Sequence, residues 1–195
     1  MAVKSLSTRI AIIGRGAKCS GGSSAVDRSA YISRTTMYSE YDGTYYYPKY
    51  SEDLVHSEVM LPENAPKEYA DPSVLWNSVE MREKNNSKAQ LARAYKISIP
   101  NEWSYELATE VVRDYVKRNF VDDGMCVQFA IHDSENSVTH QRNLHCRMMM
   151  TMRPIMEDGT WGEKQKKIYI LDADGNKIRT KKGNYKCTTQ DVTGW

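Results

Sequence analysis

The chain has 195 residues, a formal net charge of +2, 40% hydrophobic residues and 27% charged residues. This length suits one domain with a substantial core, and this composition is typical of a globular protein. No run approaches the roughly 18 consecutive apolar residues that a membrane-spanning helix needs, and the N-terminus lacks the pattern of a secretory signal peptide. We therefore expect a cytoplasmic protein that does not associate with a membrane.

Charge is unevenly distributed along the chain. Basic residues outnumber acidic ones in residues 1–50 and 138–195, whereas acidic residues dominate residues 51–137. This asymmetry indicates a one-sided basic surface on which an anionic polymer could dock.

The four cysteines are not spaced as in a zinc finger; they are Cys19, Cys126, Cys146 and Cys187. Cys126 and Cys146 lie inside apolar, strand-like runs. We expect these two to be small buried core residues and all four to be reduced.

The first elements are a strand and a helix. Residues 6–13 are rich in β-forming residues and end at Gly14, and a Gly/Ser stretch follows. Ser24 is a typical helix N-cap, and the apolar spacing after it predicts a helix over residues 24–35. This helix would carry Tyr31.

A second strand and helix follow a tyrosine-dense segment. Residues 36–50 contain six tyrosines and a turn signal at Asp42-Gly43. Residues 54–61 predict a strand. Asp71-Pro72 then reads as an N-cap followed by a first-turn proline, which predicts a helix to about residue 84.

The next part predicts one more helix between strands. Residues 89–99 change from helix-like to alternating, strand-like spacing. Ser104 caps a strongly amphipathic helix over residues 105–120. Residues 126–132 and 143–153 then predict two neighbouring strands.

The C-terminal part predicts a basic hairpin. A turn signal at Asp174-Gly175 lies between two strand-like runs, which predicts a β-hairpin over residues 166–180. With this hairpin, the order of elements favours an α+β fold with an antiparallel-rich central sheet and packed helices, rather than a doubly wound parallel sheet.

Three of the four histidines lie close together in the sequence. His132 and His145 sit on the two neighbouring predicted strands, and His140 lies in the connection between them. Adjacent antiparallel strands can bring two imidazoles near enough to share one cation, and imidazole suits Mn or Zn better than Ca or Mg. Ordinary polar residues at the border between a loop and a strand would give the same pattern.

Most of the chain, from Ser24 to Trp195, resembles the MobA/MobL family of plasmid relaxases, which belong to the HUH endonucleases. The resemblance lies in six blocks that stand in order: SAVDRSAY at 24–31, LVHSEVMLPENAPKEYAD at 54–71, SVLWNSVE at 73–80, AQLARAYKISIP at 89–100, CVQFAIHD at 126–133 and NLHCRMMMTMRPIMEDGTWG at 143–162. The combination is specific, although each block alone is not.

The resemblance implies a mechanism. A tyrosine attacks one phosphodiester of single-stranded DNA at a plasmid transfer origin, which leaves a 5′-phosphotyrosine link and a free 3′-hydroxyl. A divalent cation (Mn, Mg or Zn) held by three histidines polarises the phosphate. Carried over to this chain, Tyr31 is the nucleophile and His132 and His145 are two ligands. Accessory relaxosome proteins and a coupling protein are the other partners implied.

The chain departs from the family at the third ligand. The second histidine strand of the family usually reads His-hydrophobe-His, whereas this chain has His145-Cys146-Arg147. Residues i and i+2 of a strand share a face, so Arg147 stands at the altered ligand position, and a guanidinium cannot ligate a cation. Three outcomes stay open: His140 substitutes as a ligand, Arg147 itself clamps the phosphate, or the site is impaired and the chain binds the origin without efficient nicking.

Several further residues are candidates. Asp133 could orient a histidine or accept a proton in catalysis. Aromatic and basic side chains that could bind single-stranded DNA are Tyr46, Tyr47, Lys164, Lys166, Lys181 and Lys182. A solvated hairpin and a structural tyrosine strand would look the same in the sequence.

We expect one relaxase-like domain over residues 1–195, which ends before the helical segments that usually follow in the family. Its basic hairpin would form an arm at about residues 164–186. A rolling-circle replication initiator, which shares the arrangement of tyrosine and histidines, is a weaker alternative.

Overall fold

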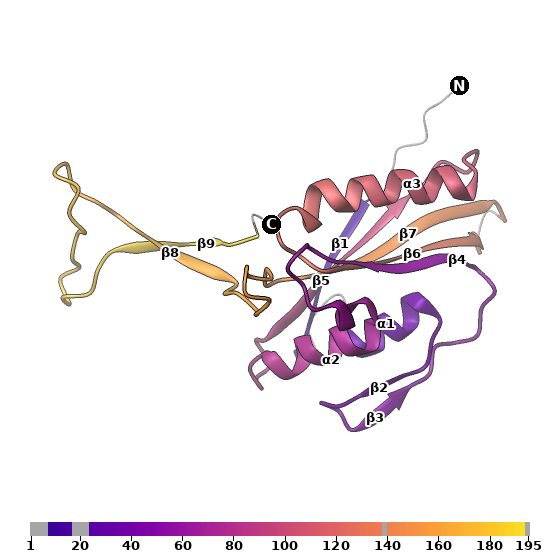
Figure 1. Cartoon of the computed structure of the whole chain (residues 1–195), viewed down its shortest axis with the longest axis horizontal. Helices are drawn as coiled ribbons and strands as arrows, with labels where there is room; N and C mark the ends of the chain where they lie inside the picture. The colour runs from indigo at the N-terminus through magenta and orange to yellow at the C-terminus, as the bar shows by residue number, and fades with distance from the viewer. Residues whose placement is uncertain (1–7, 17–23, 138–139, 194–195) are drawn as a thin grey trace.

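A five-stranded antiparallel sheet forms the centre of the computed structural model, which describes residues 8–16, 24–137 and 140–193. In spatial order its strands are β1 (Thr8–Gly14), β5 (Gln90–Ser98), β7 (Arg142–Thr151), β6 (Val127–Glu135) and β4 (Leu54–Met60). The helices α1 (Ala25–Ser33) and α2 (Pro72–Arg82) lie on one face, and α3 (Tyr105–Val116) lies on the other (Figure 1). The α+β fold with an antiparallel sheet is therefore confirmed.

Short elements complete the chain. A small hairpin, β2 (Met37–Ser39) and β3 (Thr44–Tyr46), follows α1, and a 3₁₀ turn, η1 (Lys67–Ala70), precedes α2. After α3 the helix continues as a π-helical segment, η2 (Lys117–Val121), so the helix predicted to residue 120 changes its winding near its end. None of the described helices is long and apolar enough to cross a membrane.

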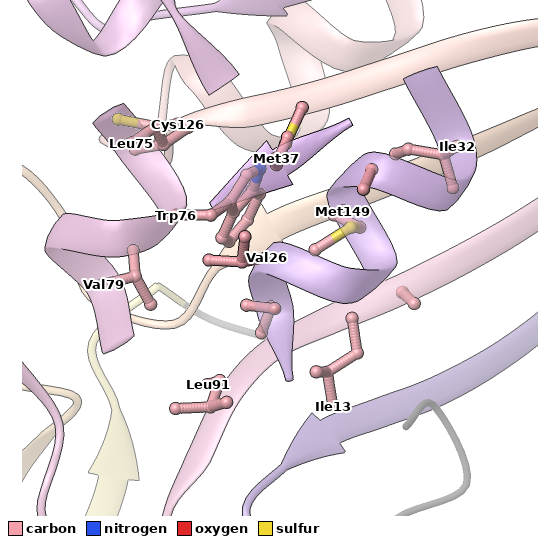
Figure 2. Packing of buried hydrophobic residues seen from close by; sticks show 14 of the residues in the cluster. Ile13, Val26, Ile32, Met37, Leu75, Trp76, Val79, Leu91, Cys126 and Met149 are labelled. Atoms are coloured by element: carbon pink, nitrogen blue, oxygen red, sulfur yellow. The ribbon is translucent and has the colours of Figure 1, made fainter. Parts of the chain in front are cut away.

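Strand alternation gives the sheet two cores. Even-numbered residues of β6, such as Gln128 and Ala130, face α1 and α2, whereas Phe129 and Ile131 face α3. Beneath α1 and α2, the side chain of Trp76 packs near Val26 (Figure 2). The cysteines predicted to be buried, Cys126 and Cys146, are fully buried, whereas Cys19 lies outside the described residues.

Nearly all of the segment over residues 89–99 is a strand, β5 over Gln90–Ser98, and no part of it is helical. Leu91 to Tyr95 are all buried, because β5 lies between β1 and β7 and helices cover both faces of the sheet there. A strand that is buried on both faces shows no alternation, which explains its helix-like spacing in the sequence.

The predicted hairpin over residues 166–180 is present next to its turn, where Leu171 bridges to Lys177 and the amide of Ile178 donates to the carbonyl oxygen of Ile170 at 3.0 Å, but it is wrong for the outer residues. The turn at Asp174-Gly175 is present, but it is followed by a second turn at Gly183, and both glycines have a positive φ of 81°. The chain therefore returns later, so that β8 (Gln165–Tyr169) pairs with β9 (Cys187–Asp191). The resulting arm projects away from the sheet (Figure 1).

A buried carboxylate holds the start of α1. Ser24 is the N-cap, as predicted, and its hydroxyl accepts from the amide of Asp27 at 3.2 Å. Glu80 of α2, fully buried, accepts from the Ser24 hydroxyl at 2.8 Å and from the amides of Ala25 and Val26 at 2.5 and 3.1 Å. A negative charge at the positive end of the helix dipole is favourable, so α1 is tied to α2 at its first turn.

We predict that Glu80→Ala destabilises the protein by about 3 kcal/mol, because it leaves three buried donors without their acceptor. Glu80→Gln, which keeps an oxygen at this position, should cost less. Urea unfolding measures both, with Glu163→Ala at an exposed glutamate as the control. Equal urea midpoints for Glu80→Ala and Glu163→Ala would contradict this role.

Candidate active site

Tyr31 lies on the last turn of α1, half-buried, and its ring packs against the core between the helices and the sheet. Three guanidinium carbons surround the ring centre: Arg34 at 4.7 Å, Arg28 at 5.0 Å and Arg147 at 5.2 Å. Arg28 stands three residues before Tyr31 on α1, so the helix brings it to the side of the ring. Arg34 caps the end of α1 and donates to the carbonyl oxygen of Tyr31 at 2.7 Å. Arg147 reaches the same ring from β7.

His132 and His145 face each other directly across β6 and β7. Their ring centres are 5.5 Å apart, with 22° between the ring planes, and both side chains are buried. Burial lowers the pKa of both imidazoles to about 4, so both are neutral at pH 7. Nδ1 of His145 lies 2.8 Å from the carbonyl oxygen of Asn143, to which a neutral ring can donate, which leaves its Nε2 as an acceptor.

Asp53, which the sequence patterns did not single out, lies beside this pair. Its Oδ2 is 3.4 Å from Nδ1 of His132, and both of its oxygens accept from Arg34 at 2.9 Å. Burial opposes ionisation, but hydrogen bonds from Arg34 and Ser51 hold the pKa of Asp53 well below its usual range. Asp53 directly precedes Leu54, which pairs with His132 in the sheet, and no local pattern in the sequence indicates this pairing.

The predicted site residues come together only where their side chains lie on the same face of the sheet. His132, His145 and Arg147 share the face that α1 covers, so Tyr31 and the two imidazoles lie on the same side of the sheet. Asp133, the next residue after His132, points to the α3 side, where Arg142 and Tyr105 donate to its carboxylate at 2.8 and 2.7 Å. The structure therefore does not bring Asp133 to Tyr31.

His140 is also separate from the pair. It lies in the turn between β6 and β7 with its side chain 76% exposed, and its Nδ1 is 2.5 Å from Glu135. It stands several residues beyond the paired histidines, and each residue adds about 3.3 Å along a strand. The structure does not bring it to His132 and His145.

The described residues do not fit a cation site with three histidines. Nε2 of His132 is buried without a hydrogen-bond partner among the described residues, and its Nδ1 has only the Asp53 oxygen at 3.4 Å, which suits a ligand. However, Arg147 occupies the third position with a permanent positive charge, and Arg34 already holds the carboxylate of Asp53. In the described part of the chain, no three His, Cys, Asp or Glu side chains are grouped to hold a metal ion.

The aromatic candidates for DNA binding separate by face. Tyr46 packs against the core, and its hydroxyl donates to Asp42 at 2.9 Å; burial and Asp42 raise its pKa to about 12. Tyr38, Tyr45 and Tyr47 are exposed instead, with ring centres 4.9 Å apart for the first pair and 6.1 Å for the second. Tyr47 therefore stays a candidate for DNA binding, whereas Tyr46 is turned toward the core. Strand alternation places Tyr45 on the exposed face opposite to Tyr46 and is the sequence signal for it.

The lysine candidates also differ. Lys166, Lys181 and Lys182 are exposed on the arm. Lys164 is largely buried at the base of the arm, where it pairs with Glu83 at 2.8 Å and donates to the carbonyl oxygen of Gln90. Lys164 therefore fixes the arm to the domain.

Most of the chain is similar in sequence to known proteins. Residues 23–195 match the model of the MobA/MobL family. The conjugal transfer protein TraA of Agrobacterium fabrum is 38% identical over 142 residues, which are 68% of this chain and 12% of that protein. The probable mobilization protein MobA of Bifidobacterium longum is 30% identical over 159 residues, which are 80% of this chain and 27% of that protein.

A third relative is the 43 kDa relaxation protein of Salmonella typhimurium, 31% identical over 70% of this chain and 33% of that protein. The chain thus spans a third or less of the length of these three relatives. The fold also matches a chain in the solved structure "Molecular Basis of Vancomycin Resistance Transfer in Staphylococcus aureus", with a TM-score of 0.71 and 23% identity over 83% of this chain and 77% of that chain. The family match over residues 23–195 shows that this chain belongs to the MobA/MobL family.

Proposed function

We propose that this chain is the DNA-cutting domain of a relaxase for plasmid mobilisation, in which Tyr31 attacks one strand at the transfer origin. The observation that carries the proposal is the position of the half-buried Tyr31 ring. It lies on the same sheet face as two neutral imidazoles, with three guanidinium groups around it. The names of the relatives, which are conjugal transfer, mobilization and relaxation proteins, support the same process.

The proposed step exchanges one phosphate ester for another. The phenol oxygen of Tyr31 forms a bond to phosphorus, the bond from phosphorus to the 3′ oxygen breaks, and the phenolic proton is transferred to the leaving 3′ oxygen. A neutral imidazole can carry that proton, and His132 and His145 are both neutral at pH 7. The surrounding guanidiniums would stabilise the negative charge on the phenol and the phosphate. We assign no step to a cation.

A second candidate function is binding of the origin without efficient cutting. Arg147 at the third ligand position favours it, because a chain that needs a cation held by three histidines would be impaired. In this case the chain would still bind a single strand of DNA, but it would form no covalent link.

Two exposed surfaces could bind the strand. Bases could stack on the rings of Tyr38, Tyr45 and Tyr47. Backbone phosphates could bind the basic arm over residues 165–191, where Lys166, Lys181 and Lys182 are exposed and Arg179 lies 4.3 Å from the ring of Tyr185. We propose this arm as part of the same DNA-binding domain; the accessory relaxosome and coupling proteins stay predictions.

Incubating the chain with single-stranded oligonucleotides tiled across the transfer origin should yield a covalent adduct that survives denaturing electrophoresis. Tyr31→Phe should abolish the adduct, since phenylalanine has no nucleophilic oxygen, and should keep DNA binding. Tyr47→Phe, on an exposed ring, is the matched control. Binding without any adduct would favour the second candidate function.

Arg147→His should create the missing third ligand beside His145. Calorimetry with Mn²⁺ and Zn²⁺ should then detect binding at micromolar strength or better in the variant and none in the unchanged chain. Arg118→His, at an exposed position on the α3 side, controls for the added histidine. Binding of equal strength by the unchanged chain would contradict the role assigned to Arg147.

Reversing two arm charges, Lys181→Glu with Lys182→Glu, should weaken DNA binding and flatten its salt dependence. For a single strand, the slope of log affinity against log salt should fall by about 0.7 for each phosphate that the arm no longer neutralises. Fluorescence anisotropy at several salt concentrations measures this slope. An unchanged slope would remove the arm from the interface.

A further inference from the structure

Three basic side chains lie in register across neighbouring strands, on the face of the sheet that α1 and Tyr31 cover. Arg9 of β1 pairs with Lys96 of β5, and Lys96 pairs with Arg147 of β7. Their neighbours on this face, Ala94 and Met149, belong to the core beneath α1 and α2. Arg28 of α1 adds a fourth cation, at 5.0 Å from the centre of the Tyr31 ring.

These four cations are not neutralised by ion pairs. None of them forms a salt bridge with a described residue, whereas Arg34, Arg93 and Arg153 each have an acidic partner within 3.0 Å. The Nε atoms of Arg28 and Arg147 are buried and have no hydrogen-bond partner within the described ranges. Donors of this kind, buried and charged, cost stability unless a ligand satisfies them.

The cations also repel one another. Burial and the charge of Arg147 lower the pKa of Arg28, and burial, Arg147 and Arg9 lower that of Lys96. Like charges directly opposite each other on neighbouring strands destabilise a sheet. The fold therefore keeps an arrangement that weakens it, and this points to a ligand that neutralises the charge.

The geometry selects the ligand. Arg28 and Arg147 approach the Tyr31 ring from a helix and from the sheet, and Lys96 extends the charge along the sheet from Arg147. A guanidinium presents a planar set of donors that matches the oxygens of a phosphate, and its charge does not depend on pH near neutrality. A phosphodiester that reaches Tyr31 would therefore meet donors from two elements.

We propose that Arg28, Lys96 and Arg147 form a phosphate-binding cradle beside Tyr31, which holds the backbone of a single strand of DNA without a divalent cation. In this proposal Arg147 takes over the role of the third histidine, because it binds the phosphate directly where the histidine would hold a cation. The cradle rests on the proposed function only for the role of Tyr31; its binding of phosphate can be tested without any cutting.

The test measures binding of a fluorescent oligothymidylate by anisotropy, in EDTA, with Tyr31→Phe as the background so that no adduct can form. Arg28→Gln, Lys96→Gln and Arg147→Gln should each weaken binding about tenfold and reduce the salt slope by about 0.7. Arg118→Gln, which removes the same charge from an arginine paired with Asp114 on the α3 side, is the matched control and should change neither value.

Thermal unfolding separates a ligand site from a structural role. Because Lys96→Gln and Arg147→Gln relieve repulsion between neighbouring strands, both should unfold at the same or a higher temperature than the background protein. Weaker binding together with unchanged or higher stability supports the cradle. Binding as tight as that of the Arg118→Gln control overturns it, and so does an affinity that requires added Mn²⁺.

The two proposals fail in different ways. If the unchanged chain forms an adduct at Tyr31 and the three cradle variants still bind normally, the cradle is wrong and the cutting function stands. If the variants lose affinity but the unchanged chain forms no adduct with origin oligonucleotides, the cradle stands and the chain is a binding protein.

Discussion

The carboxylate of Glu80 accepts hydrogen bonds from the first turn of α1 and thereby fixes the helix that carries Tyr31. Because this contact is buried, α1 and α2 form one unit on the sheet. Arg34 ends α1 in a left-handed conformation, with φ of 56°, and its side chain returns to the carbonyl oxygen of Tyr31 and to Asp53. Tyr31 thus lies between a fixed start and a fixed end, and its position over the histidine strands follows from both.

The second constraint is the two-residue period of the strands. It places His145 and Arg147 on one face of β7, and the direct pairing of His132 with His145 brings the two imidazoles together. The same period turns Asp133 away toward α3, where Arg142 and Tyr105 hold it. A site on one face of a sheet can therefore use only every second residue of each strand that contributes to it.

Helix capping and strand alternation explain how much of the fold and of the site could be predicted from the sequence. Local patterns were sufficient for the N-cap at Ser24, the helix that carries Tyr31 and the two histidine strands, because each depends on neighbours in the chain. Strict alternation would also have excluded Asp133 and Tyr46. The pairing of β8 with β9 was out of reach, since two turn signals left two possible partners.

Residues that act over long distances in the sequence gave no local signal. Glu80 meets the start of α1 more than fifty residues away, and Arg28 acquires its significance only when α1 lies over Arg147. Asp53 is in the same class, since its contact with His132 depends on the pairing of β4 with β6.

The base of the arm is fastened to the domain at both of its ends. Arg93 of β5 pairs with Asp191 of β9 at 3.0 Å, and Glu83 at the end of α2 pairs with Lys164 just before β8. One of these anchors is an interior strand of the sheet. Arg93 lies three residues before Lys96 on β5, so the base of the arm and the row of cations on the sheet are joined through one continuous strand.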